Sequence, residues 1–275
     1  MARALLSDEG LAARPSLCMT EEKLPPKARL LPLVVLLMAL LIWTALALLR
    51  VFPESAFPSP PAVARGFVEE VRTGRLLNDL IASLFRVTTG FALAVGLGLP
   101  LGLVMGNRAR ARAALLPAVN FFRNLSPLAW IPFAILWFGI GDVPAIFLIF
   151  MASFFPIVLA TIAAVANIPA VYFRVARNYG LSGARLSTRV TLPAIAPQVI
   201  TALRVTAGLA WVVVVAAEMI AGRDGLGFAV WDARNGLRMD LLVVGMIVIG
   251  LIGVLIDRIL LRLTLIKSVR WGYER

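Results

Sequence analysis

The 275-residue chain contains no histidine and only one cysteine, Cys18. Without histidine it lacks the commonest metal ligand and general base, and one cysteine cannot build a disulfide framework. The three lysines are Lys23, Lys27 and Lys267, and none follows a glycine, which excludes a G-x4-G-K-[ST] phosphate-binding loop. We therefore expect no metal site, no cofactor and no catalysis by this chain alone, so that any nucleotide must be bound and hydrolysed by a partner.

Charged residues are also few, at 15% of the chain, whereas hydrophobic residues make up 60%. No soluble core needs that much apolar sequence, so the composition predicts an integral membrane protein. The net charge of +12 comes largely from arginines that cluster in short loops beside apolar segments. Because this is the positive-inside pattern of membrane proteins, we expect no nucleic-acid partner.

Six apolar segments approach or exceed the length of about twenty residues that a membrane-spanning helix needs. They are 30–49, 87–105, 113–138, 144–166, 194–221 and 241–256. The mixed, amphipathic stretch 63–85 suits the membrane interface. The first segment is too long for the apolar part of a signal peptide, so we expect a retained helix. The sequence thus predicts an all-α integral membrane fold with six transmembrane helices.

Loop charges orient these helices. The loops after the second and fourth segments are rich in arginine: Arg108, Arg110, Arg112, Arg174, Arg177, Arg185 and Arg189. Such short loops stay on the cytoplasmic side, and an even number of spans then places both termini there. We expect a cytoplasmic N-terminal segment 1–29, a transmembrane domain 30–266 and a cytoplasmic tail 267–275.

Small residues line one face of the second segment, where Ala94, Gly98, Gly102 and Gly106 follow one another at four-residue spacing. This pattern lets a neighbouring backbone approach closely. Two interpretations stay open, namely tight packing within the subunit and a contact with a second copy.

Polar residues and prolines interrupt the third segment at R-N-L-S-P-L-A-W-I-P, residues 123–132. A charge at membrane depth usually faces a cavity or a partner, and a broken helix leaves free N–H groups that attract anions. The candidates for a translocation path are therefore Arg123, Asn124, Ser126 and Pro127. In the alternative, the break lies at the cytoplasmic interface and the arginine extends to lipid headgroups.

Glu218 is the sole carboxylate of the fifth segment and is a further candidate for the path. It can pair with an arginine in a gate, or it can reach the outer interface in a structural role. Arg86 and Arg204 lie near segment ends, where the same choice between a path and an interface applies.

The most specific pattern lies in the loop 168–193, between the fourth and fifth segments. Ala176 is followed four residues later by Gly180, and nine residues separate Gly180 from a V-T-L-P run that begins at Val190. This spacing resembles the E-A-A-x3-G-x9-I-x-L-P motif in the cytoplasmic loop of ABC-importer permeases, with Arg174 at the position of the family's glutamate.

Local chemistry supports a rigid helix-turn-helix in this loop. Gly180 can take the left-handed conformation that ends a helix, and Ser182 can cap a second short helix that starts at Gly183. Such a pair of helices can transmit a rigid-body movement to the fourth and fifth spans. The alternative is a surface loop whose arginines only set the topology.

Three further stretches, 123–141, 214–228 and 257–261, resemble permeases for alkanesulfonates, taurine, nitrate and bicarbonate. The resemblance implies a type I importer permease fold with a cytoplasmic coupling helix. It also implies a second copy of the chain, two cytoplasmic ABC ATPase subunits that bind ATP, and an extracytoplasmic substrate-binding protein. By position, the residues implied in coupling to the ATPase are Arg174, Ala176, Arg177, Gly180, Leu181, Ser182 and Gly183.

These observations predict the homodimeric permease of an importer for a small anion, with sulfonate or taurine ranked above nitrate or bicarbonate. The competing class is a secondary transporter or channel driven by a gradient. Secondary carriers usually contain internal repeats and intramembrane acids for ion coupling, whereas no repeat is evident here and acids inside the spans are scarce.

The topology makes the first testable prediction. Single cysteines in the loops that contain Arg110 and Arg185 should be protected from an impermeant thiol reagent added to intact cells, because arginine-rich short loops resist translocation. Labelling of a cysteine at Ser182 from outside would overturn this topology.

Overall fold

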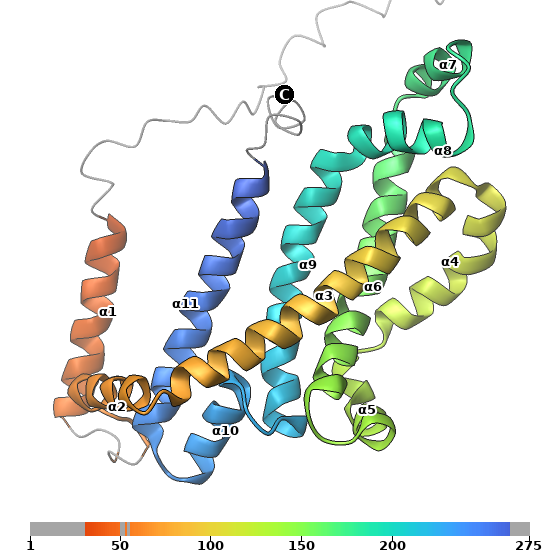
Figure 1. Cartoon of the computed structure of the whole chain (residues 1–275). Helices are drawn as coiled ribbons and strands as arrows, with labels where there is room; N and C mark the ends of the chain where they lie inside the picture. The colour runs from red at the N-terminus through yellow and green to blue at the C-terminus, as the bar shows by residue number, and fades with distance from the viewer. Residues whose placement is uncertain (1–30, 50–52, 54–55, 265–275) are drawn as a thin grey trace, which may run out of the picture. The chain divides into compact units, whose positions relative to one another are not determined.

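All regular elements are helical in the part of the chain that the computed structural model describes, residues 31–49, 53 and 56–264 (Figure 1). No strand occurs among these residues, so the predicted all-α class is confirmed. The predicted terminal segments 1–29 and 267–275 lie outside them.

The first helix, α1 (Leu31–Leu48), belongs to a unit, Met1–Val51, that is separate from Phe52–Arg275. Its 18 residues are uncharged. At 1.5 Å per residue they extend about 27 Å, close to the hydrocarbon thickness of a bilayer. The first predicted segment is therefore a helix with the composition of a membrane span.

Four helices of the second unit are long and apolar enough to cross a membrane. They are α3 (Arg75–Asn107), α6 (Asp142–Ala166), α9 (Leu192–Ala221) and α11 (Met239–Thr264). The shorter apolar helices, Leu33–Leu48 and Pro127–Phe138, lie in the first and third predicted segments. The described helices thus account for all six predicted segments.

The boundary before the second span differs from the prediction. The amphipathic stretch 63–85 is divided between α2 (Pro60–Arg72) and the start of α3. Gly74, with φ of 74°, forms the turn between them. Nothing after Arg75 breaks the helix, and Arg86 is neutralised inside the protein instead of marking a helix end. The 33 residues of α3 extend about 50 Å, more than the hydrocarbon core requires.

The third predicted segment is broken as expected. It forms α4 (Ala109–Asn124), the short 3-10 helix η3 (Pro127–Trp130) and α5 (Ile131–Phe138). Proline has no N–H and is tolerated in the first turn of a helix, so Pro127 and Pro132 start new helices here.

Within Phe52–Arg275 the long helices run back and forth between two ends (Figure 1). One end, called the loop end, carries α7 (Ala170–Asn178) and α8 (Gly183–Leu186) beside the last turn of α3. The opposite end, called the α10 end, carries α10 (Leu226–Asn235) and the first turns of α6 and α11.

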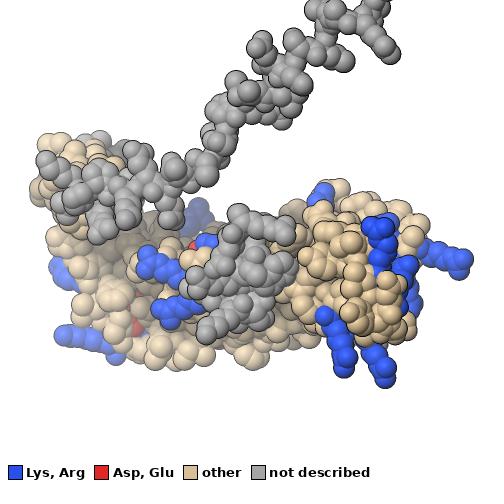
Figure 2. Space-filling view, turned by 90° about the horizontal axis from the view of Figure 1, so that it is seen from above, with Lys and Arg blue, Asp and Glu red and all other residues tan. Residues whose placement is uncertain are grey.

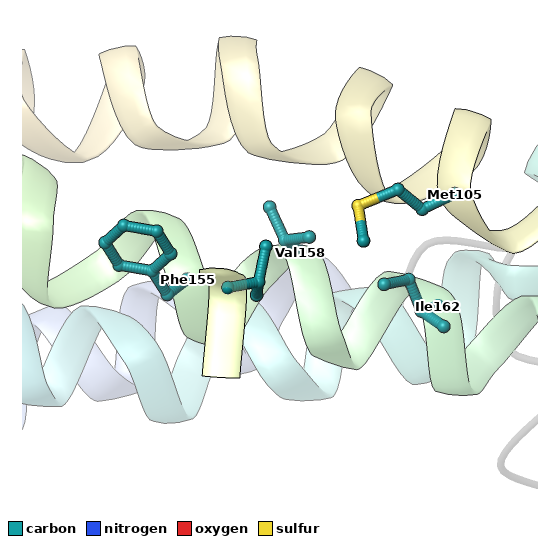
Figure 3. Packing of buried hydrophobic residues seen from close by; sticks show 5 residues of the cluster. Met105, Phe155, Val158 and Ile162 are labelled. Carbon is teal, nitrogen blue, oxygen red and sulfur yellow. The ribbon is translucent and has the colours of Figure 1, made fainter. Parts of the chain in front are cut away.

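The most extensive helix contact joins α3 to α6. A Cβ added at Gly102 would lie 2.6 Å from the Thr161 Cβ and 3.0 Å from the Val158 carbonyl oxygen, so the two backbones approach too closely for a larger residue. The interpretation of the small-residue face as packing within the subunit is confirmed. Figure 3 shows the apolar side chains between these helices, among them Met105, Phe155, Val158 and Ile162.

This packing predicts that substitutions at two glycines of α3 differ in their effect on stability. Gly102→Val should destabilise the protein by about 1 to 3 kcal/mol, because its side chain overlaps α6. Gly96→Val is the matched control, since no atom lies within 4 Å of a Cβ added there. Thermal unfolding in detergent measures both. Equal melting temperatures for the two variants would contradict the assigned packing.

Candidate functional site

A glycine cap closes the first helix of the loop end. Gly180, just after α7, has a left-handed backbone with φ of 70°. Its N–H donates to the carbonyl of Arg177 at 2.9 Å, and the N–H of Leu181 donates to the carbonyl of Ala176 at 3.0 Å. These two bonds form a Schellman motif, which glycine adopts without the steric penalty of a Cβ. The predicted capping conformation of Gly180 is confirmed.

A second left-handed glycine, Gly183, with φ of 55°, starts α8. The carbonyl of Ser182 accepts a bond from the N–H of Leu186 at 3.4 Å, so the second short helix begins where predicted. A π-helical turn, η4 (Ser187–Thr191), then leads directly into α9. Such turns are frequent at functional sites. The loop is therefore connected to α9 through continuous helical residues.

The surface of α7 combines apolar and basic side chains. One stripe of exposed apolar residues follows helical spacing: Val171, Tyr172, Val175 and Tyr179. Exposed arginines occur in the same loop, in α7, α8 and η4: Arg174, Arg177, Arg185 and Arg189. Figure 2 shows arginine side chains projecting from the end that carries α4, α7 and α8. Ser182 is also exposed, whereas Ala176 is buried. An exposed apolar stripe rimmed by charges is typical of a protein contact.

The predicted path residues lie at the break between α4 and η3. Arg123, Asn124 and Ser126 are exposed, and Pro127 is half-buried. At 1.5 Å per residue, Arg123 lies about 21 Å along α4 from its start at the loop end. The adjacent Phe122 stacks on Phe155 of α6 with ring centroids 5.5 Å apart. This stacking holds the break against α6.

A buried ionic cluster, which the sequence indicated only in part, lies at the α10 end. Arg86 of α3 and Glu218 of α9 are 1% and 0% exposed, and they form an ion pair at 2.8 Å. Arg86 also pairs with Asp142, the first residue of α6, at 2.6 Å, and with Asp224 in the turn after α9. A single guanidinium therefore joins three helices and the turn that precedes α10.

Backbone groups at the start of α10 complete this cluster. Three successive N–H groups donate to its side chains, each at 2.9 Å: Gly225 to Asp79, Leu226 to Ser83 and Gly227 to Glu218. The hydroxyl of Ser83 donates to Glu218, also at 2.9 Å. Because buried polar groups are costly without such partners, these bonds fix the position of α10.

The contacts of Glu218 place this carboxylate in an enclosed ion pair. Its side chain is fully buried and pairs with Arg86. It is also not grouped with Arg123, whose side chain is exposed at the α4–η3 break. Charged residues within apolar helices are the signal that pointed to Arg86 and Glu218. Among the described residues, no three acidic, histidine or cysteine side chains are placed to hold a metal ion.

Residues 98–265 match the family described as "Binding-protein-dependent transport system inner membrane component". The match extends from the last third of α3 to the end of α11 and includes the whole loop end. This chain therefore belongs to that family of membrane components.

Similarity to individual permeases covers most of the chain. The taurine transport system permease protein TauC of Escherichia coli is 34% identical over 79% of this chain and 81% of its own length. The bicarbonate transport system permease protein CmpB of Synechococcus elongatus is 35% identical over 83% of this chain and 86% of its own length. The predicted membership among ABC-importer permeases is confirmed.

The fold is shared with a chain of a solved ABC transporter. A chain of the MetNI methionine ABC transporter, in an inward-facing conformation, matches with a TM-score of 0.57 at 22% identity. The match covers 70% of this chain and 97% of that one. The predicted type I permease fold is confirmed.

The ionic cluster predicts a strong effect of Arg86→Met on stability. The change leaves Glu218 buried without its countercharge, which costs about 3 to 5 kcal/mol and corresponds to roughly 10 °C in melting temperature. The matched control is Arg238→Met, just before α11 and outside the cluster. It breaks pairs with Glu69 and Asp240 in which the arginine is 45% exposed and Glu69 51% exposed, so it should cost no more than about 1 kcal/mol. Equal melting temperatures would refute the role of Arg86.

Proposed function

We propose that this ABC permease is the non-catalytic membrane subunit of an ATP-driven importer for a small anion. The observation that carries the proposal is the loop end. It presents an exposed apolar stripe, with exposed arginines in the same loop, on a helix whose end is fixed by the left-handed Gly180. This surface suits a groove on an ATPase subunit, with α7, α8 and the turn between them as the coupling element.

Packing behind the loop supports a role in transmitting movement. The last turn of α6 and the first turns of α9 share an apolar cluster that includes Val165, Ile195 and Val199. Because the loop continues into both helices, a displacement of the loop moves both of them together. The residues proposed to couple are Arg174, Ala176, Arg177, Gly180, Leu181, Ser182 and Gly183.

Membership of the family supports the proposed partners. Two copies of the chain form the path, and two cytoplasmic ATPase subunits bind and hydrolyse ATP below it. An extracytoplasmic binding protein delivers the substrate, in accord with the binding-protein dependence in the family's description. Each subunit thus supplies one coupling loop for one ATPase.

In the proposed orientation the loop end is cytoplasmic and the α10 end is extracytoplasmic. The exposed arginines of the loop end support this orientation through the positive-inside rule. The termini, segments 1–29 and 267–275, are then cytoplasmic and flank the transmembrane domain 30–266 of an inner-membrane protein.

The proposed substrate is a small oxyanion. Relatives named for taurine and for bicarbonate support this class. We rank sulfonate or taurine above nitrate or bicarbonate, as the sequence resemblance does. The anion retained by the cognate binding protein, measured by isothermal titration, tests this ranking.

Replacement of Gly180 tests the coupling role. In Gly180→Val a left-handed backbone with a Cβ costs about 1 to 2 kcal/mol, and a side chain in a close contact with the ATPase costs about 1 to 3 kcal/mol more. The variant should insert in the membrane normally but lose bound ATPase and substrate uptake together. Co-purification and uptake assays measure both.

Gly74→Val is the control for the backbone cost alone. Gly74 has φ of 74°, and like Gly180 it has no atom within 4 Å of an added Cβ, but it lies in the turn before α3, far along the chain from the loop end. This variant should keep its ATPase. Retention of the ATPase and of substrate-stimulated hydrolysis by Gly180→Val would show that the loop does not couple.

Arg123 is proposed to lie on the path and to hold or gate the anion. Its position well along α4 from the loop end, next to the proline break, supports depth within the membrane. Asn124, Ser126 and Pro127 share this break. Glu218 is proposed to act on the path only through the pair with Arg86, because its own side chain is enclosed.

Arg123→Gln should therefore lower uptake while the ATPase stays bound. The change removes the charge that would attract the anion but keeps a polar side chain of similar length. Uptake into proteoliposomes and co-purification are the two measurements. Wild-type uptake by the Arg123→Gln variant would contradict a role on the path and favour the alternative in which Arg123 contacts lipid headgroups.

A further inference from the structure

A cavity of about 780 Å³ lies at the loop end, between the last turns of α3 and α6 and the helices of the loop. The anion path proposed above does not use it, whereas two of the residues proposed to couple, Arg177 and Gly183, lie in its lining. Part of its wall is apolar and includes Pro100 and Val104 of α3, Phe173 of α7 and Leu186 of α8. Another part contains two arginines, Arg108 and Arg177.

The polarity of the cavity changes along α3. Pro100 and Val104 lie one turn apart on the membrane-spanning helix, and Arg108 follows one turn later as the helix ends. No acidic side chain is among the described residues that line the cavity. An apolar wall that ends in positive charge at the end of a span matches a lipid tail beneath an anionic headgroup.

The two faces of α7 separate this cavity from the proposed ATPase contact. Ala170, Phe173 and Arg177 line the cavity at spacings of three and four residues. The exposed apolar stripe, represented by Val175 and Tyr179, is absent from that lining and lies on the opposite side of the helix wheel. One face of α7 is thus available to a protein partner while the other faces the cavity.

We infer that this cavity binds an anionic phospholipid. Arg108 and Arg177 hold the phosphate, and an acyl chain lies against Pro100 and Val104. The ligand would contact α3 and the loop at once, so that Arg177, one of the residues proposed to couple, joins the lipid to the coupling element. A soluble inorganic anion would use the arginines but leave the apolar wall uncovered.

Native mass spectrometry of the purified protein in detergent, titrated with phosphatidylglycerol or phosphatidylcholine, tests this inference. Phosphatidylglycerol should bind more tightly. Arg108→Gln should weaken the binding of phosphatidylglycerol about fivefold, which is the change expected for the loss of one arginine near a headgroup. Val104→Trp, at a position 44% exposed, should block the acyl wall without a change of charge. Arg110→Gln is the matched control, since Arg110 is two residues away and does not line the cavity.

Three results would overturn the inference: equal binding of the two lipids, equal losses in Arg108→Gln and Arg110→Gln, or unchanged binding in Val104→Trp. Displacement of the lipid by millimolar inorganic phosphate or methanesulfonate would assign the arginines to a soluble anion and overturn it as well. Gly180→Val should retain the lipid even where it loses the ATPase, so failure of the lipid site and failure of the coupling role are distinguishable.

Discussion

The buried pair of Arg86 and Glu218 is the interaction on which the arrangement of α3, α6 and α9 depends. A charged side chain removed from water is tolerated only with a countercharge and hydrogen bonds, and Arg86 has both from α6, α9 and the turn before α10. Because these partners come from segments far apart in sequence, the pair cannot form until the helices are in place. It therefore specifies their register at the α10 end.

Close packing fixes the position of α3 against its neighbours along the rest of its length. The glycines of its small-residue face bring α3 and α6 into backbone contact, and the apolar cluster behind the loop joins α6 to α9. Helices held at one end by ion pairs and along their length by close packing move as a body. In the proposed mechanism, a force applied to the loop end of α6 and α9 is carried toward the α10 end.

Much of this structure could be predicted from the sequence because hydropathy and glycine chemistry are local. The apolar segments became helices, the proline break appeared at Pro127, and Gly180 took its left-handed cap. The predicted start of α3 was wrong because Arg86 was interpreted as marking a helix end. Its charge is stable inside the protein only because residues distant in sequence pair with it. The cavity beside Arg108 had no sequence signal, since its walls come from α3, α6 and the loop.

The central claim is that ATP hydrolysis on partner subunits drives an anion through this chain. Its most direct test is uptake of radiolabelled taurine by proteoliposomes that contain the chain, its ATPase subunits and its binding protein. The account predicts uptake that requires ATP on the ATPase side and binding protein on the other, and that ionophores do not abolish. Uptake driven by an ion gradient without ATP would contradict it.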